Sequence, residues 1–270
     1  MEIKEWLQSD IAQDIWSKKY QYDNETLDEW FDRVSGGDED LKQLIIDKKF
    51  LFGGRTLTNR NTDDSGSYFN CYSSGYVEDD YKEIMDTNTK LGLTYKAQGG
   101  QGVSFSKLRP KGTPIGKRFV SDGIIPFMRI YNETTKGTSQ GGSRKGALLM
   151  SLDIRHKESE EFIKIKSDSS TIDKANLSLE IDDAFMDAVS KYYENGEEIT
   201  LHEIRNYGGH KIEYDIIPIK LYKLMTKTSY NWAEPGVIFT ERFRNYNIME
   251  LDDDYQIENC NPCGRKACLM

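Results

Sequence analysis

From residue 52 onward, short apolar runs alternate with longer segments of helical character. The apolar runs lie at 103–105, 147–150, 177–179 and 237–239. The helical segments carry apolar residues at i, i+3, i+4 spacing and lie at 79–96, 158–166, 182–195 and 218–229. Parallel strands need a crossover of about a dozen residues, and segments of this length supply it. The alternation therefore predicts an α/β fold around a mainly parallel sheet.

The first fifty residues predict helices instead. Apolar side chains recur at helical spacing over 27–34, after a candidate N-cap at Asn24, and Gly36 ends the segment. A second short helix is expected around 41–45. We expect this region to pack as a helical entry to the main body.

Charge and hydropathy exclude several classes of protein. The formal net charge is −9, whereas binding of nucleic acid or anionic lipid needs clustered Lys and Arg. A local basic pocket for a small anion stays compatible with this charge. No stretch approaches the ~18 apolar residues of a membrane span, and no basic start precedes an apolar run. We expect a cytoplasmic protein with no membrane and no direct nucleic-acid partner.

Three of the four cysteines lie within the last eleven residues. Such clustering is unlike a secreted disulfide framework, which distributes its pairs over a smaller chain. Residues 260–264 read Cys-Asn-Pro-Cys-Gly, so Cys260 and Cys263 form a CxxC. This spacing suits a redox pair or half of a zinc site, but the sequence holds no second CxxC and no HxxxH. We expect no metal site.

Glycine-rich stretches at 99–102 and 139–147 are candidate phosphate loops. Backbone N–H groups left accessible by glycine can cradle phosphate oxygens, and nearby Arg or Lys adds charge. The 99–102 stretch is neither a Walker loop nor a dinucleotide fingerprint, so by itself it is equally compatible with a turn.

Together these segments resemble, in order, the motifs of ribonucleotide reductase large subunits. The matching segments are 53–57 with 69–72, 99–112, 139–147, 156–163, 176–179, 233–239 and 260–264. By this resemblance, 53–57 looks like the first barrel strand, 107–112 like the effector loop, 139–147 like the specificity loop and 260–264 like the radical-cysteine loop. Each motif alone is weak, but their common order is specific.

The resemblance implies an α/β architecture with a helical N-terminal region, 1–50, followed by the first half of a ten-stranded α/β barrel, 51–264. Residues 265–270 read as a divergent tail. Arg265 stands where the family has a catalytic glutamate, and a guanidinium cannot act as a base at neutral pH. The family's second half-barrel, with its other reducing cysteine, is not matched. We therefore expect the isolated chain to be inactive, as the product of an interrupted or split gene.

The resemblance also implies the chemistry, which is reduction of ribonucleotides to deoxyribonucleotides for DNA synthesis. Cys263 would carry the thiyl radical that removes the 3′ hydrogen, Asn261 would bind the reacting sugar, and Cys71 would be one reducing thiol. Asn261 and Cys263 are two residues apart, so on an extended loop they point to the same side. Without this resemblance, a lone cysteine such as Cys71 is more often a small apolar filler.

Two sets of binding residues follow from the same resemblance. The expected substrate-binding residues are Thr56, Asn70, Gly100 and Arg144. The expected residues for the nucleotide effector, a dNTP or ATP, are Asp79, Lys107, Arg109 and Gln140. A surface salt bridge is the alternative role for Arg109 and Arg144.

The implied radical source is adenosylcobalamin or, alternatively, a metal-containing small subunit. Further expected partners are a thioredoxin-like reductant and the missing C-terminal half or a second chain that supplies it. The alternative to an enzyme fragment is a non-catalytic nucleotide-binding module, or half of a split enzyme. The choice between diphosphate and triphosphate substrates stays open.

The histidines and acidic runs predict ordinary structural roles. His156 follows a predicted strand and should satisfy a loop hydrogen bond, whereas His202 and His210 should lie at the surface. The carboxylate runs at 158–161 and 252–254 predict solvated faces.

Overall fold

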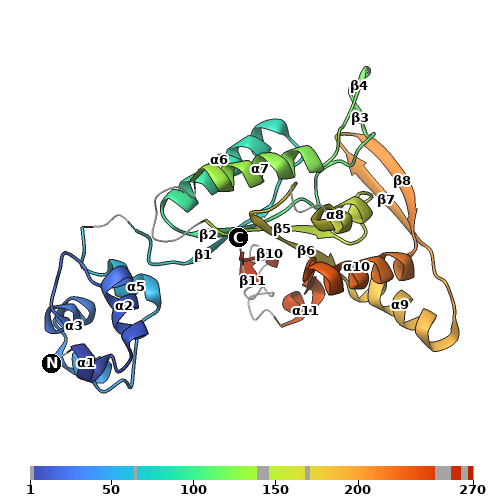
Figure 1. The fold of residues 1–270 in the computed structure, drawn as a ribbon. Coiled ribbons are helices and arrows are strands. Elements are labelled where there is room, and N and C mark those ends of the chain that lie inside the picture. The colour runs from blue at the N-terminus through green and yellow to red at the C-terminus, as the bar shows by residue number, and fades with distance from the viewer. Residues whose placement is uncertain are drawn as a thin grey trace. The chain divides into compact units, whose positions relative to one another are not determined.

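The computed structural model describes residues 3–63, 66–138, 146–167, 171–246, 257–262 and 267–269. The chain forms two compact units, Met1–Asn70 and Cys71–Met270, and each is described here by itself (Figure 1). The boundary predicted at residue 50 falls inside the first of these units. No described helix is long and apolar enough to cross a membrane.

The first unit is helical, as the apolar periodicity predicted. Its helices are α1 (Ile3–Trp6), α2 (Asp10–Lys19), α3 (Leu27–Ser35), α4 (Glu39–Ile46) and α5 (Gly54–Asn59). They enclose a small core whose buried side chains are Trp6, Trp16, Leu27, Trp30, Phe31, Val34, Ile45 and Leu57.

The N-cap predicted for α3 was wrong by two residues. Thr26 is the N-cap, and its hydroxyl and the Glu29 carboxylate form a reciprocal capping box. Asn24 instead lies in a left-handed turn, with a φ of 58°. Gly36 ends the helix in the left-handed conformation, as predicted.

Segment 53–57 is not the first barrel strand that the sequence led us to expect. Residues 54–59 form helix α5, and Leu57 is buried in the core of the first unit. Burial of this one apolar side chain among the other helices outweighs the poor helix propensity of Gly54 and Thr56. The first strand begins at Cys71 instead.

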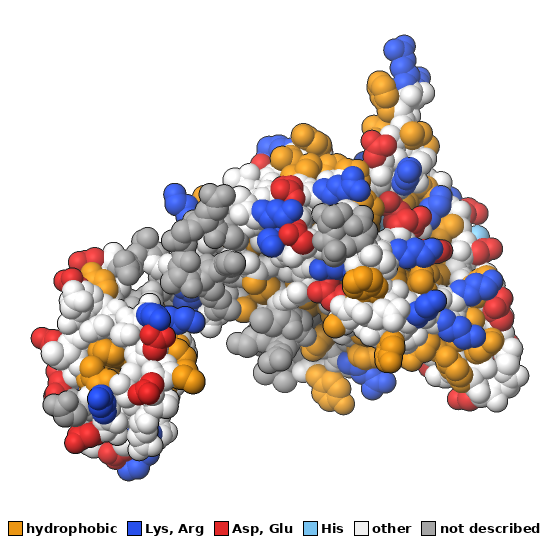
Figure 2. Space-filling view, viewed as in Figure 1, with side chains coloured by type: hydrophobic (Ala, Val, Ile, Leu, Met, Phe, Trp, Pro, Cys, Tyr) orange, Lys and Arg blue, Asp and Glu red, His pale blue; other side chains and the backbone are white. Residues whose placement is uncertain are grey.

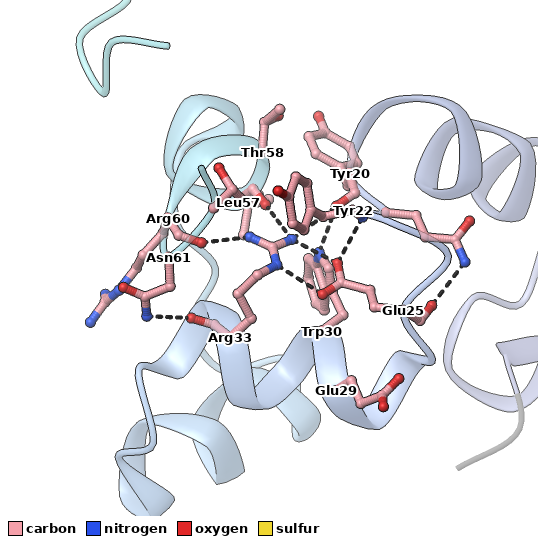
Figure 3. A network of polar contacts seen from close by, with 12 residues as sticks. Tyr20, Tyr22, Glu25, Glu29, Trp30, Arg33, Leu57, Thr58, Arg60 and Asn61 are labelled. Atoms are coloured by element: carbon pink, nitrogen blue, oxygen red, sulfur yellow. Dashed lines mark hydrogen bonds and ion pairs between the residues drawn. The ribbon is translucent and has the colours of Figure 1, made fainter. Parts of the chain in front are cut away.

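A nearly buried ion pair connects α3 to the segments around it (Figure 3). The Arg33 guanidinium donates to both Glu25 carboxylate oxygens at 2.8 Å. It also donates to the carbonyl oxygens of Arg60, at 2.7 Å, and Tyr20, at 3.0 Å. The side chains of Arg33 and Glu25 are only 8% and 10% exposed. The charges are therefore compensated inside the unit rather than by water.

The second unit is built on a parallel five-stranded sheet, which confirms the predicted α/β class. The strands follow the order β1 (Cys71–Tyr76), β2 (Gly100–Ser104), β5 (Leu148–Asp153), β6 (Ala175–Ile181) and β9 (Gly236–Phe239). Every neighbouring pair in this sheet is parallel.

Helices connect these strands where the sequence predicted them, and two further helices were missed. The helices are α6 (Tyr81–Lys96), α7 (Ile125–Thr138), α8 (Ser159–Lys164), α9 (Asp183–Asn195), α10 (Pro218–Trp232) and α11 (Thr240–Asn245), with a 3₁₀ turn at Ile165–Ser167. Asp182 caps α9, Gly196 ends it, and proline begins α10. Helices α7 and α11 were not predicted.

The sheet has one apolar and one polar face. The apolar face packs against α6–α10, and its side chains include Val103, Leu148, Met150, Leu152, Leu177 and Leu179. Side chains alternate between the faces, and residues in register share a face. The opposite face therefore carries Gly100, Gly102, Ser104, Ser151, Asn176, Ser178 and Glu180, together with Leu149 and Ile238. Its glycines and small polar residues leave room for another segment of chain, and Leu149 and Ile238 pack against Cys260.

Three antiparallel pairs complete the described fold. These are β3 (Pro114–Ile115) with β4 (Phe119–Val120), β7 (Leu201–Tyr207) with β8 (His210–Ile216), and β10 (Ile257–Cys260) with β11 (Ala267–Leu269). The β3–β4 hairpin projects from the unit, and Figure 2 shows apolar and basic side chains along it.

Candidate functional site

Residues 260–262 lie directly on the polar face of the sheet. Cys260 and Asn261 are buried, at 1% and 4% exposure. A Cβ added to Gly102 would lie 2.0 Å from the Cys260 carbonyl oxygen, and one added to Gly100 would lie 2.9 Å from Pro262 Cγ. Glycine at both positions of β2 thus allows this close approach.

Cys71 lies on the same face and at the same end of the sheet. It is half-buried, and it pairs in register with Gly100 on the neighbouring strand. Asn176, on β6, approaches the same loop from the other side, with its Nδ2 atom 3.5 Å from the Pro262 carbonyl oxygen. The structure therefore brings Cys71, Gly100 and Asn261, three of the predicted site residues, to one region.

Of the other predicted active-site residues, two belong to the first unit and the rest are not described. Thr56 lies on α5 and Asn70 ends the first unit. Cys263, Arg144 and Gln140 lie outside the described residues, as do Arg265 and the acidic run at 252–254. The described site is therefore built from the second unit alone, and residues 260–262 lead directly to Cys263.

A cavity of about 290 Å³ opens beside this loop. Its polar lining comes from Asn176, Ser178 and Glu234, and Pro262 forms part of its wall. Glu234 accepts from the Lys166 ammonium group at 2.9 Å, so its charge is balanced. The volume suits a group of sugar size, because pockets for whole drug-sized ligands span about 300–1,000 Å³.

A second cavity, of about 360 Å³, contains two of the predicted effector residues. Arg109 Nε donates to the Asp79 carboxylate at 2.8 and 2.9 Å, and the Arg109 backbone N–H donates to it at 3.1 Å. The remaining lining residues are Asp80, Tyr81, Ile84, Leu108, Ile115, Val120, Ser121, Asp122, Gly123, Pro126 and Phe127. Apolar walls can contact a nucleobase, and the charged pair beside them can contact the polar and anionic groups of the same ligand.

Lys107, the third described effector candidate, does not line this cavity. Its ammonium group lies 2.5 Å from a Glu78 carboxylate oxygen and 4.8 Å from the centre of the Tyr76 ring. The tip of the β7–β8 hairpin reaches Arg109 instead. A Cβ added to Gly208 would lie 3.2 Å from an Arg109 guanidinium nitrogen. Sequence reasoning missed this hairpin, although Gly208-Gly209 between two alternating runs signals a tight turn.

His156 makes the loop hydrogen bond that the sequence predicted. Its Nε2 lies 2.9 Å from the Leu108 carbonyl oxygen, and its Nδ1 accepts from the Glu158 backbone N–H at 3.1 Å. These partners require a neutral ring with the proton on Nε2. Burial lowers the pKa of His156 to about 4, which keeps it neutral at physiological pH. His202 is exposed as expected, and His210 is half-buried.

The expectation of a solvated acidic face at 158–161 was wrong for its first residue. Glu158 is buried, and one of its carboxylate oxygens accepts the backbone N–H groups of Lys111 and Ile124, each at 3.1 Å. Burial raises the pKa of Glu158, and the two N–H groups oppose this. Its partners are distant in sequence, so no local pattern signalled the contact.

Glu180, on the polar face, is a further buried carboxyl group that sequence reasoning missed. Ser151 Oγ donates to one of its oxygens at 2.6 Å, and Ser106 Oγ donates to the other at 3.0 Å. Burial raises the pKa of Glu180, and the serine hydroxyls partly oppose the shift. This cluster lies at the carboxyl ends of β2, β5 and β6, away from the 260–262 loop at their amino ends.

Comparison with known proteins gives a consistent family. Residues 70–267 match the family described as the ribonucleotide reductase barrel domain. A vitamin B12-dependent ribonucleoside-diphosphate reductase of Thermoplasma acidophilum is 32% identical over 231 residues, which is 85% of this chain and 29% of that protein. A reductase of the same description from Mycobacterium tuberculosis is 29% identical over 251 residues, 92% of this chain and 34% of that protein.

A solved structure shares the fold. The alpha subunit of the class Id ribonucleotide reductase of Actinobacillus ureae superposes with a TM-score of 0.74 at 17% identity, covering 96% of this chain and 45% of that one. The chain thus spans about a third of the length of the curated relatives described above. With its parallel sheet and the family match over residues 70–267, the chain belongs to the ribonucleotide reductase family and carries part of its barrel domain.

Proposed function

We propose that this chain carries the radical-cysteine loop and the effector site of a ribonucleotide reductase catalytic subunit. The supporting observation is the burial of residues 260–262 against Gly100 and Gly102, beside Cys71 on the same face. The reaction converts a ribonucleotide and two thiols into a deoxyribonucleotide, a disulfide and water. The named relatives are ribonucleoside-diphosphate reductases, so the proposed substrate is a diphosphate.

Each proposed residue has a distinct task in this reaction. Cys263, as a thiyl radical, takes the hydrogen atom from C3′ and returns it after the 2′-hydroxyl has left as water. Cys71 supplies one of the two reducing thiols, and Asn261 orients the sugar by hydrogen bonding. The remaining proposed contacts to substrate come from Thr56, Asn70, Gly100 and Arg144.

We further propose that the chain does not turn over by itself. The reaction needs a carboxylate to accept the 3′-hydroxyl proton, and Arg265 cannot fill that role because its guanidinium stays protonated. A second polypeptide segment would supply the carboxylate and the second thiol, and a thioredoxin-like protein would reduce the resulting disulfide. The proposed setting is cytoplasmic deoxyribonucleotide synthesis.

Adenosylcobalamin is the proposed source of the radical, because the named relatives depend on vitamin B12. A metal-containing small subunit is the alternative. No cluster of His, Cys, Asp and Glu among the described residues could hold a metal ion.

The test is complementation. The purified chain is incubated with a labelled ribonucleoside diphosphate, a dithiol and adenosylcobalamin, alone and together with a polypeptide that covers the rest of the barrel of a relative. We expect deoxynucleotide only in the complemented mixture, and none with Cys263→Ser or Cys71→Ser. Cys268→Ser is the matched control and should stay active. Product from the chain alone would refute the proposed dependence on a second segment.

A nucleotide-binding module is the second candidate function. The observation that favours it is the cavity around Asp79 and Arg109, which the described part of the second unit forms without any other chain. The proposed effector contacts are Asp79, Lys107, Arg109 and Gln140. Deoxynucleotide binding by calorimetry, combined with failure of every complementation, would favour the module over the split enzyme.

A further inference from the structure

We propose that Glu158 is a positioning residue that holds the effector loop in its binding shape. This inference rests on the proposed effector function of the cavity around Asp79 and Arg109. The loop comprises residues 109–124 and includes the projecting β3–β4 hairpin. Glu158 itself does not line the cavity, so its role is exerted through the backbone.

The carboxylate of Glu158 joins the two ends of this loop. One oxygen accepts the N–H of Lys111, near the beginning of the loop, and the N–H of Ile124, at its end, both at 3.1 Å. Between these points the chain contributes Ile115, Val120 and Ser121 to the cavity wall. This acceptor therefore joins the two ends of the loop at its base, next to the backbone bonds from Gly112 N–H to the Ser121 carbonyl oxygen and from Ser121 N–H to the Thr113 carbonyl oxygen, both 2.8 Å.

The absence of a side chain at Gly123 leaves space for this carboxylate. A Cβ added to Gly123 would lie 2.2 Å from the other oxygen of Glu158, and Gly123 has a φ of 84°, where side chains are disfavoured. His156 orients Glu158 from the opposite side, because it accepts the Glu158 N–H while it bonds the Leu108 carbonyl oxygen. Leu108 immediately precedes Arg109. The same clamp thus controls the approach of the guanidinium to Asp79.

The contacts explain why a carboxylate is suited to this place. Both N–H groups converge on one oxygen that has two lone pairs, and Ile124 directly precedes the positive end of α7. An alanine would leave the buried Ile124 N–H and the partly buried Lys111 N–H without their acceptor, and the loop would rearrange to reach water. A glutamine keeps the acceptor oxygen at nearly the same position and should keep the loop closed.

The experiment compares four variants of the full chain. Glu158→Ala removes the clamp, Glu158→Gln preserves the acceptor, and Glu158→Asp shortens its reach in case the alanine variant does not fold. Glu161→Ala is the matched control, because Glu161 is exposed on α8. Calorimetry measures the Kd of each deoxynucleoside triphosphate, and hydrogen exchange measures the protection of the Lys111 and Ile124 amides.

The clamp predicts a specific pattern across these variants. Glu158→Ala should raise the Kd about tenfold and expose both amides, because both N–H groups lose their acceptor. Glu158→Asp should weaken binding less, and Glu158→Gln and Glu161→Ala should match the wild type. Wild-type binding by Glu158→Ala or Glu158→Asp with both amides unprotected would overturn the inference. Amides that stay protected in Glu158→Ala would also overturn it.

Arg109→Ala separates the inference from the proposed function. If wild-type binding is lost in Arg109→Ala, the cavity is the nucleotide site, and the Glu158 series tests the clamp alone. If the wild type binds no deoxynucleotide, the proposed effector function fails. Loss of Lys111 and Ile124 amide protection in Glu158→Ala then still tests whether Glu158 clamps the loop.

Discussion

Gly102 is the position where a single methyl group should disturb the proposed active site most. An added Cβ would lie 2.0 Å from the Cys260 carbonyl oxygen and 3.2 Å from the Asn261 carbonyl carbon. Ordinary contact begins near 3.4 Å, so the loop must move by more than an ångström. Strand β2 cannot yield instead, because β1 and β5 hold it on both sides.

We expect Gly102→Ala to cost about 1–3 kcal/mol of unfolding free energy, as overpacking usually does. The larger effect should be on catalysis. A displacement of about 1 Å can cost ~100-fold in rate, and this loop leads directly to Cys263. In the complemented reaction we therefore expect deoxynucleotide formation to fall about 100-fold or more.

Thiol labelling tests the same prediction without catalysis. Cys260 is 1% exposed in the wild type, so its labelling should be slow and should become faster in Gly102→Ala. Gly92→Ala is the control, because an added Cβ there meets only Thr134 and Thr138 methyl groups at 3.6 Å within a helix. Gly92→Ala should stabilise the chain by roughly 0.5–1 kcal/mol. Full activity and slow Cys260 labelling in Gly102→Ala would refute the reasoning.

Three further predictions concern buried ionisable side chains. Glu25→Ala should destabilise the first unit by about 3–5 kcal/mol, measured by urea unfolding, because Arg33 is left buried without its partner. Burial raises the pKa of Glu180 above its ordinary value of 4.5, so its stabilising contribution is present below that pH and is lost as pH rises through the folded-state pKa. Glu180→Gln should therefore gain stability relative to the wild type as pH rises above 4.5, and a constant difference would contradict this. The pKa of His156 is lowered from 6.5 to about 4, so His156 stabilises above pH 6.5 and loses up to about 3 kcal/mol as pH falls towards 4. His156→Asn should lack this acid-dependent loss in denaturation curves.

The sheet was predictable because its sequence signal is local. The runs at 103–105, 147–150 and 177–179 lie in buried strands, and α9 carries its own caps, Asp182 and Gly196. Local signals also existed where the prediction was wrong or silent. Thr26 and Glu29 have the spacing of a capping box, and Gly208-Gly209 has that of a hairpin turn.

Helix α5 and the buried carboxyl groups could not be predicted, because they depend on contacts between segments that are distant in sequence. Residues 54–59 became helical because Leu57 is buried in the core of the first unit. Glu158 was assigned to a solvated face because its neighbours Glu160 and Glu161 are indeed exposed, whereas its own partners lie in another loop. Glu180 likewise meets serines from two other strand ends. Asp79 and Arg109 were brought together as the resemblance implied, and Lys107 was not.

A single-turnover experiment on the complemented protein tests the central claim most directly. The mixture receives ribonucleoside diphosphate and adenosylcobalamin but no external reductant, and mass spectrometry follows the peptide that contains Cys71. The account predicts that Cys71 enters a disulfide in step with deoxynucleotide formation, with about one disulfide for each product formed. Deoxynucleotide formed while Cys71 remains a free thiol would contradict it.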